Sequence, residues 1–339
     1  MKTWAVPYLA CPATGSPLDL RVEKCEGDEV LSGVLISREG REYGIERGIA
    51  SLGLEFQNRK ERSTVTSFGK QWKTFNKCDG FMGSDDLFFS FLPDLSRDSF
   101  KEKVVLEAGC GNGRWLTQLA EMGPQKVIGF DYSESVETSW ENTRHLPNVT
   151  VVQGSILEPP FQSNVFDVVV TIGVLHHLSD PKRGLAALKD LIKHDVGQLA
   201  AWVYGHEGNE MYLRLAKPLR TITPHLPMPL LMMLSRILAI PVWCHSKTIN
   251  RWFGVKSDGS SRLPMGEYIE LLSKISLRDL TGVVYDQLSP QLAQYYRKDQ
   301  VLELIDSAGL ELSRLSTPRD NSYSFLTKNP CGRAEKSAA

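Results

Sequence analysis

The stretch Val104-Val-Leu-Glu-Ala-Gly-Cys-Gly-Asn-Gly-Arg-Trp115, followed by Lys126-Val-Ile-Gly-Phe-Asp131, decides the fold of this chain. It predicts a buried strand, a tight turn with Gly109, Gly111 and Gly113, a helix, and a second strand ending in a carboxylate. Such a βαβ unit is typical of nucleotide binding, because glycines let the backbone approach a ligand and the helix N-terminus offers unpaired N–H groups. The acidic strand end can accept hydrogen bonds from a ribose.

Two details argue against NAD as that nucleotide. The dinucleotide fingerprint has a third glycine three places after the second, at a position that Arg114 occupies here. A pyrophosphate would sit against the helix N-terminus, and the charge of Glu107, just upstream, would oppose it. A carboxylate there suits a ligand that carries an ammonium group. The pattern Glu-x-Gly-x-Gly-x-Gly with a later acid resembles motif I of class I S-adenosylmethionine (SAM)-dependent methyltransferases.

The bulk composition indicates a soluble globular protein with one large domain and a smaller one. The chain has 339 residues, 42% of them hydrophobic, and a formal net charge of −1, so its charge suggests neither nucleic acid nor an acidic partner. The N-terminus does not resemble a signal peptide, and no apolar run is long enough to predict a membrane-spanning helix. The six cysteines are scattered, as expected of reduced thiols in a cytoplasmic protein.

Residues 1–54 predict a small β-rich module, followed by a polar linker over 55–66. The module resembles the zinc-ribbon-like activator subunit of some RNA and protein methyltransferases. In a metal-binding version, Cys11 would be followed by a second cysteine where this chain has Thr14, and the segment 37–39 has no cysteine either. Since a zinc site needs four soft or imidazole ligands, we expect no metal here. The module then serves as a scaffold or docks the acceptor.

From residue 67 to 328, strand and helix patterns alternate, which predicts an α/β domain. The resemblance implies a Rossmann-like class I methyltransferase sheet of seven strands, mostly parallel, with a terminal antiparallel hairpin. The aromatic run Ser67–Phe75 is similar to a segment that folds over the cofactor in related enzymes, although it could equally anchor an N-terminal helix. We expect a flexible tail over 329–339.

The resemblance also implies the cofactor site. Phe166–Pro181 closely resembles the fourth-strand segment of the small-molecule methyltransferase branch, and the cofactor would be SAM. Glu107 and the Gly109–Gly111 backbone would hold its methionine part, Asp131 its ribose, and Ser155 would border the adenine as a neutral, weaker partner than the Asp of many relatives. The complete expected set is Glu107, Gly109, Cys110, Gly111, Asp131, Tyr132, Gly154, Ser155, Ile156 and Ile172.

Methyl transfer requires the acceptor to be aligned with the sulfonium, shielded from water and, for a hydroxyl or protonated amine, deprotonated by a general base. His176 and His177 leave the fourth strand at the sheet edge where ligands gather in open α/β folds. His177 is the first candidate base, with His206 and Tyr204 behind it. The alternative is that one of the histidines packs against or caps the next helix.

The acceptor should be decided by the insertion over 205–290. Residues 209–257 contain seven Lys or Arg and one acid, Glu210, and the apolar run Pro227–Trp243 is interrupted by Arg236. This segment could line a pocket for a lipophilic or anionic acceptor or lie at a membrane surface, without spanning it; it could also simply pack on the sheet. The expected function is methylation of a small-molecule O or N acceptor. The alternatives are an RNA-modifying methyltransferase and a non-catalytic SAM-fold binding subunit; the oligomeric state stays open.

Overall fold

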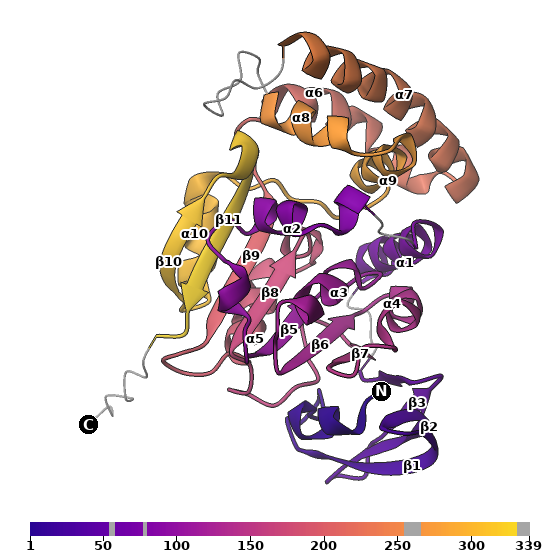
Figure 1. The fold of residues 1–339 in the computed structure, drawn as a ribbon, viewed down its shortest axis with the longest axis vertical. Helices are drawn as coiled ribbons and strands as arrows, with labels where there is room; N and C mark the ends of the chain where they lie inside the picture. The colour runs from indigo at the N-terminus through magenta and orange to yellow at the C-terminus, as the bar shows by residue number, and fades with distance from the viewer. Residues whose placement is uncertain (54–57, 77–79, 254–265, 331–339) are drawn as a thin grey trace.

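One eleven-stranded sheet runs through the protein (Figure 1). The computed structural model describes residues 1–53, 58–76, 80–253 and 266–330. The strand order is β1-β2-β3-β4-β7-β6-β5-β8-β9-β11-β10. The strands from β7 to β10 in this order form the expected seven-stranded sheet, and the N-terminal strands extend it on one side.

The central strands are parallel, and apolar helices cover both faces. They are β5 (Val104–Ala108), β6 (Lys126–Asp131), β7 (Val149–Gln153), β8 (Val168–Ile172) and β9 (Gln198–Tyr204). All five residues of β5 are buried, as expected of a parallel strand covered on both sides. The covering helices include α3 (Arg114–Glu121), α4 (Ser135–Thr143), α5 (Pro181–Lys189) and α10 (Lys298–Ser307).

The sheet closes with an antiparallel hairpin, as predicted. Strand β11 (Ser322–Lys328) pairs antiparallel with both β9 and β10 (Glu311–Ser316). Within the predicted tail, Asn329 is buried and its amide nitrogen lies 3.1 Å from His194 Nδ1. Residues 331–339 lie outside the described part of the chain.

The N-terminal module shares the sheet and core of the α/β domain. It contains η1 (Thr3–Tyr8), β1 (Leu18–Glu26), β2 (Glu29–Ser37), β3 (Glu42–Glu46) and β4 (Ile49–Ser51). Strand β4 pairs parallel with β7, and Leu9, Leu35 and Leu52 belong to the same apolar cluster as Phe130 and Phe166. The module is therefore packed into the domain rather than joined to it by a flexible connection.

Polar contacts join the two turns where a zinc-ribbon would place its ligands. Glu39 accepts hydrogen bonds from the hydroxyls of Thr14 at 3.1 Å and Ser16 at 2.9 Å, while Cys11 Sγ lies 3.1 Å from Tyr43 Oη. Across the residues that the structure describes, no group of three or more His, Cys, Asp or Glu side chains is arranged to hold a metal ion.

Part of the predicted linker is helical. Helix α1 (Arg59–Thr74) begins after Asn58, whose side chain accepts a hydrogen bond from the Glu61 N–H at 2.9 Å and so caps the first turn. Residues 55–57 lie outside the described part of the chain. The linker prediction was wrong from residue 59 onward. The segment was interpreted as a linker because it is polar and charged, but one face of the helix carries the buried Glu61, Thr64 and Gln71.

Helices gather above the carboxyl ends of the parallel strands (Figure 1). Helix α2 (Asp85–Phe91) lies between β4 and β5 in the chain. The insertion supplies α6 (Glu210–Leu219), η5 (Thr223–His225), α7 (Met228–Phe253), α8 (Gly266–Lys274) and α9 (Leu277–Leu288). Three further short helices are η2 (Gly80–Gly83), η3 (Arg97–Ser99) and η4 (Leu175–His177), and a fourth, η6 (Pro318–Asp320), precedes β11.

By length and composition alone, the Met228–Thr248 part of α7 could cross a membrane. The expectation that no segment is long and apolar enough was therefore too strict. Pro241 lies inside the helix without ending it, and Met228–Thr248 contains only two charged residues, Arg236 and Lys247. Only 17% of the most apolar part of this helix is buried. A helix in the core of a soluble protein would be mostly buried, so α7 does not have the burial of a core helix.

Candidate functional site

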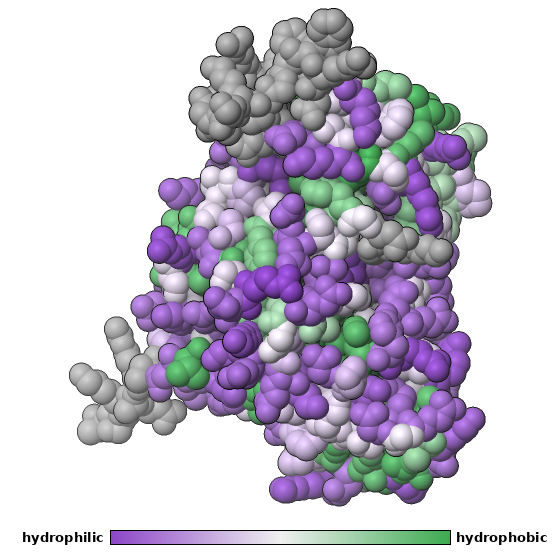
Figure 2. Space-filling model, in the orientation of Figure 1, coloured by the Kyte–Doolittle hydropathy of each residue, from purple (hydrophilic) through white to green (hydrophobic). Residues whose placement is uncertain are grey.

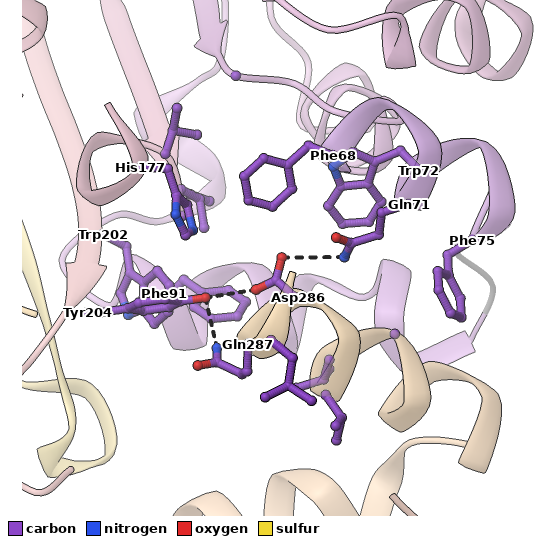
Figure 3. Close-up of a pocket in the computed structure, with 18 of the residues that line it drawn as sticks. Phe68, Gln71, Trp72, Phe75, Phe91, His177, Trp202, Tyr204, Asp286 and Gln287 are labelled. Carbon is purple, nitrogen blue, oxygen red and sulfur yellow. Dashed lines mark hydrogen bonds between the residues drawn. The ribbon is translucent and has the colours of Figure 1, made fainter. Parts of the chain in front are cut away.

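One cavity of about 750 Å³ extends from the carboxyl ends of the parallel strands into the helical cap. This is within the range typical of ligand pockets, roughly 300–1,000 Å³. Its strand end is lined by Gly109, Asp131 and Tyr132, and its helical end by His177, Tyr204 and residues of α1, α6, α7, α8 and α9. Figure 3 shows part of this lining, with aromatic rings and a polar cluster directed toward the cavity.

The glycine turn has the geometry that only glycine adopts easily. Gly109 and Gly111 have φ angles of 80° and 54°, in the left-handed region. A Cβ atom on Gly109 would lie 2.4 Å from a methyl group of Val174, and one on Gly111 would lie 3.0 Å from Trp72 Nε1. The turn is therefore covered by Trp72 of α1, which favours the interpretation that the aromatic run 67–75 folds over the cofactor site.

Glu107, at the end of β5, has a carboxylate that the protein leaves unsatisfied. The side chain is buried, and its Oε2 atom has no hydrogen-bond partner among the described residues. Burial raises the pKa of Glu107 well above its usual value, while the nearby Arg114 acts in the opposite direction. An unsatisfied buried acceptor fits a ligand that brings its own donors, such as an ammonium group.

Asp131, at the end of β6, lines the cavity and also stabilises the glycine turn by a hydrogen bond. Its Oδ2 accepts the Gly111 N–H at 3.0 Å, and its Oδ1 accepts both the N–H and the hydroxyl of Ser133 at 2.8 Å. Burial raises the pKa of Asp131, and these hydrogen bonds oppose that shift. The sequence predicted the ribose-facing position of Asp131 but did not indicate its bond to the glycine turn.

Some predicted cofactor residues line the cavity and others lie behind it. Tyr132, Ser155, Ile156 and Ile172 are in the lining. Glu107, Cys110, Gly111 and Gly154 are not. Cys110 is buried with its Sγ 3.7 Å from Ser139 Oγ, and burial raises the pKa of its thiol well above the usual value, so it packs rather than reacts.

His177 lines the cavity with one ring nitrogen already engaged. Its Nδ1 lies 2.6 Å from the carbonyl oxygen of Leu292. Because a carbonyl can only accept, Nδ1 carries the hydrogen and Nε2 keeps its lone pair. Burial lowers the pKa of His177, and Phe68 packs edge-on at 4.9 Å between ring centroids. No residue in the described part of the chain forms a hydrogen bond with His177 Nε2, so this is the ring nitrogen that can take up a proton.

The other predicted catalytic residues have different positions. His176 is fully buried behind Tyr204, with ring centroids 3.8 Å apart, and neither ring nitrogen has a hydrogen-bond partner among the described residues. Burial lowers the pKa of His176 well below its usual value. It packs, as the alternative interpretation held. His206 does not line the cavity either; its backbone N–H donates to the Tyr296 carbonyl at 2.7 Å.

Tyr204 belongs to a polar cluster that the sequence did not indicate (Figure 3). Its hydroxyl donates to Asp286 Oδ2 at 2.8 Å and accepts from Gln287 Nε2 at 2.9 Å. Asp286 also accepts from Gln71 Nε2 at 3.3 Å. Burial and Asp286 raise the pKa of Tyr204 well above its usual value. Because Asp286 and Gln287 lie on α9, some 80 residues after Tyr204, no sequence spacing marks this cluster.

Comparison with known proteins supports a methyltransferase domain in this chain. Residues 105–195 match a family model described as a methyltransferase domain. A tRNA U34 carboxymethyltransferase of Campylobacter curvus is 26% identical over 200 residues, which cover 51% of this chain and 63% of that protein. A putative methyltransferase of Encephalitozoon cuniculi is 33% identical over 107 residues, covering 31% of this chain and 47% of that protein.

A SAM-dependent methyltransferase from Aquifex aeolicus is a structural neighbour with a TM-score of 0.42 and 16% identity, covering 76% of this chain and 97% of that one. The chain spans only about half the length of the first curated relatives that it matches. The domain match indicates SAM as the cofactor, and the unsatisfied oxygen of the Glu107 carboxylate and the glycine turn are compatible with it. The match does not reach residues 1–54, so their likeness to a zinc-ribbon-like module stays a prediction.

Proposed function

We propose that this chain is a SAM-dependent methyltransferase whose acceptor enters the helical end of the cavity. The observation that carries this proposal is the continuity of one cavity between the glycine turn and the side chains of His177, Tyr204 and Asp286. A methyl donor bound at the glycine turn and an acceptor bound by His177, Tyr204 and Asp286 would lie in the same cavity, as direct transfer requires.

Bound SAM would supply an activated methyl group, so the protein mainly binds, orients and excludes water. Glu107 would accept hydrogen bonds from the ammonium group and Asp131 from the ribose. Trp72 of α1 would cover the donor. His177 Nε2 would take the proton that the acceptor loses, while Asp286 and the protonated Tyr204 would orient the acceptor.

The comparisons favour an RNA acceptor over the small molecule that the sequence suggested. The relatives whose names specify a substrate are tRNA-modifying enzymes, at about 26–30% identity. The name of these relatives specifies a carboxymethyl group, so an experiment must also determine which group this chain transfers. For this chain, RNA modification is therefore the first acceptor class to test.

A small apolar acceptor is the second class, and the lining of the cavity favours it. The helical end includes Leu215, Leu219, Leu238, Val242 and Leu271 beside a few polar groups. Such a lining suits an apolar body with one reactive polar group.

The experiment incubates the purified protein and SAM carrying an isotopically labelled methyl group with total RNA, a lipid extract and an aqueous small-molecule extract. Label in one fraction, lost in the His177→Ala variant, would support transfer and identify the acceptor class. Because SAM carries no carboxymethyl group, a parallel incubation replaces it with a sulfonium analogue that carries a carboxymethyl group, and mass spectrometry of the products shows which donor is used. SAM binding without label in any fraction would favour the non-catalytic alternative and contradict the proposal.

A further inference from the structure

The exposed apolar side chains of this protein are concentrated on α6 and α7. Thirteen large hydrophobic side chains are exposed among the described residues, and ten of them lie between residues 211 and 242. We call these ten the α6–α7 apolar face: Met211, Leu215, Leu219, Ile222, Leu230, Met233, Ile237, Leu238, Ile240 and Val242. Figure 2 shows apolar residues gathered over α7, in the upper right of the molecule. Such concentrated apolar exposure marks an interaction surface.

The helical spacing shows that this face is a continuous stripe on α7. At about 100° per residue, Leu230, Met233, Ile237 and Ile240 fall within roughly 80° of one another around the helix. The opposite side of α7 carries the buried Leu231, Ser235 and Ala239, which pack toward α8 and α9. The helix is thus anchored in the protein by one side and presents an apolar side to the exterior.

Basic side chains lie on the same two helices as the apolar face, with Arg236 on α7 about 40° around the helix from Ile240, and Arg214 and Lys217 on α6. Arg214, Lys217 and Arg236 are exposed and form no ion pair with any acid in the part of the chain that the structure describes. Between residues 209 and 253 the only acid is Glu210. The net charge of the whole chain is −1, so this positive surface is local.

We propose that the α6–α7 apolar face docks on an anionic lipid membrane, with the stripe in the acyl boundary and Arg214, Lys217 and Arg236 against the headgroups. An amphipathic helix whose apolar stripe is bordered by basic residues has the chemistry of interfacial membrane binding. The proposal goes beyond the proposed methyl transfer and does not depend on it.

Two other occupants fit the face less well. A second copy of the chain would bring like charges together across a two-fold interface, since the same basic residues would face each other. Single-stranded RNA binding uses exposed aromatic rings as stacking platforms. On α6 and on α7 up to Thr248, where the exposure of side chains is described, no Trp, Tyr or Phe side chain is exposed.

The face also continues into the cavity. Leu215, Leu219, Leu238 and Val242 belong to both the exposed set and the cavity lining. Docking would therefore bring the acceptor end of the cavity to the membrane surface, where a lipophilic molecule could enter without crossing water.

The test is co-sedimentation of the full chain with phosphatidylcholine vesicles and with vesicles that also contain phosphatidylglycerol. We expect binding that is about tenfold or more tighter to the anionic vesicles. The combined Arg214→Gln, Lys217→Gln and Arg236→Gln variant should lose that preference. The Met233→Ser and Ile237→Ser variant should bind neither vesicle, and neither change touches the cavity lining.

Matched controls alter the same residue types elsewhere on the surface. Lys24→Gln with Arg38→Gln and Lys101→Gln controls for charge, and Val196→Ser with Leu302→Ser controls for apolar exposure; both should bind like the unaltered chain. Thermal unfolding of each variant verifies that it is folded.

Three results would overturn the proposal. The first is equal sedimentation with and without anionic lipid, unaffected by any variant. The second is a stable dimer that becomes monomeric in the Met233→Ser and Ile237→Ser variant without any vesicle binding. The third is binding of an RNA oligomer that the arginine and lysine changes abolish while vesicles remain unbound. Release of bound protein by high salt supports interfacial docking, whereas resistance to alkaline extraction would show insertion instead.

Discussion

Glu107 has a buried carboxylate oxygen without a partner among the described residues, which costs stability; in the proposed function, this oxygen accepts hydrogen bonds from SAM. The pKa of Glu107 is raised, so the stability it contributes is present below the usual Glu pKa and is lost as the pH rises through the raised value. We predict that Glu107→Gln raises the melting temperature of the ligand-free protein at pH 7 and weakens SAM binding by roughly 1–3 kcal/mol. Scanning calorimetry with and without SAM tests both; a less stable ligand-free variant would contradict this reasoning.

We expect protonation of His177 to cause the loss of activity on the acidic side of the pH–activity profile, its acid limb. Burial lowers its pKa below the usual value near 6.5, so Nε2 should remain unprotonated at pH 6.5 and become protonated only at lower pH. We predict activity that persists at pH 6.5 and falls below it, and a kcat reduced about 10²–10⁴-fold in His177→Gln without that limb. Steady-state rates across pH would show this. An unchanged limb in the variant would assign it to another group.

At the residue scale, the sequence was informative where function depends on local pattern. The turn at 109–113 and Asp131 are separated by one helix, so their meeting follows from a single βαβ unit. Asp286 could not be found in this way, because it meets Tyr204 only after the whole insertion has folded back. His176 and His177 are adjacent in sequence and both are buried, yet only His177 lines the cavity. The folded arrangement makes this distinction, and the sequence does not show it.

At the scale of single elements, helix α1 covers the end of the cavity that lies at the glycine turn. Trp72 contacts the turn where a Gly111 Cβ would lie, and Phe68 contacts His177. We predict that Trp72→Ala weakens SAM binding about tenfold, mainly through faster dissociation, with little loss of kcat at saturating SAM. Stopped-flow measurement of SAM dissociation is the direct assay. Trp4→Ala, a partly buried tryptophan in the N-terminal module, is the control and should leave dissociation unchanged.

Helices and strands whose apolar residues recur in a regular pattern could be predicted from the sequence. Those whose buried face depends on contacts with distant parts of the chain could not. The five parallel strands follow from runs of buried β-branched residues such as Val168–Ile172. Helix α1 was missed because its inward face carries polar side chains that contact the site, as Gln71 contacts Asp286. The length of the apolar helix α7 was missed because Arg236 was taken to interrupt the apolar run, although the helix continues through it to Phe253.

For the whole molecule, the N-terminal module and the methyltransferase-like domain should unfold together. Strand β4 pairs with β7, and the Leu52 N–H donates to the Gln153 carbonyl at 2.9 Å. Removing residues 1–53 would expose the core around Phe130 and Phe166 to water. We predict one thermal transition for the full chain, coincident by far-UV circular dichroism and tryptophan fluorescence, and an aggregating or unfolded product after the deletion. Two separated transitions would instead show an independent module.

The central claim is that the cavity holds SAM at the glycine turn, and isothermal titration calorimetry of SAM against the purified chain tests it most directly. Asp131 accepts from Gly111 and faces the cavity, so its neutral isostere should disturb both the turn and the ribose contact. The structure predicts one SAM site per chain and an affinity that Asp131→Asn lowers by about 1–3 kcal/mol. No heat of binding for the unaltered chain, or equal affinities for the two proteins, would contradict the claim.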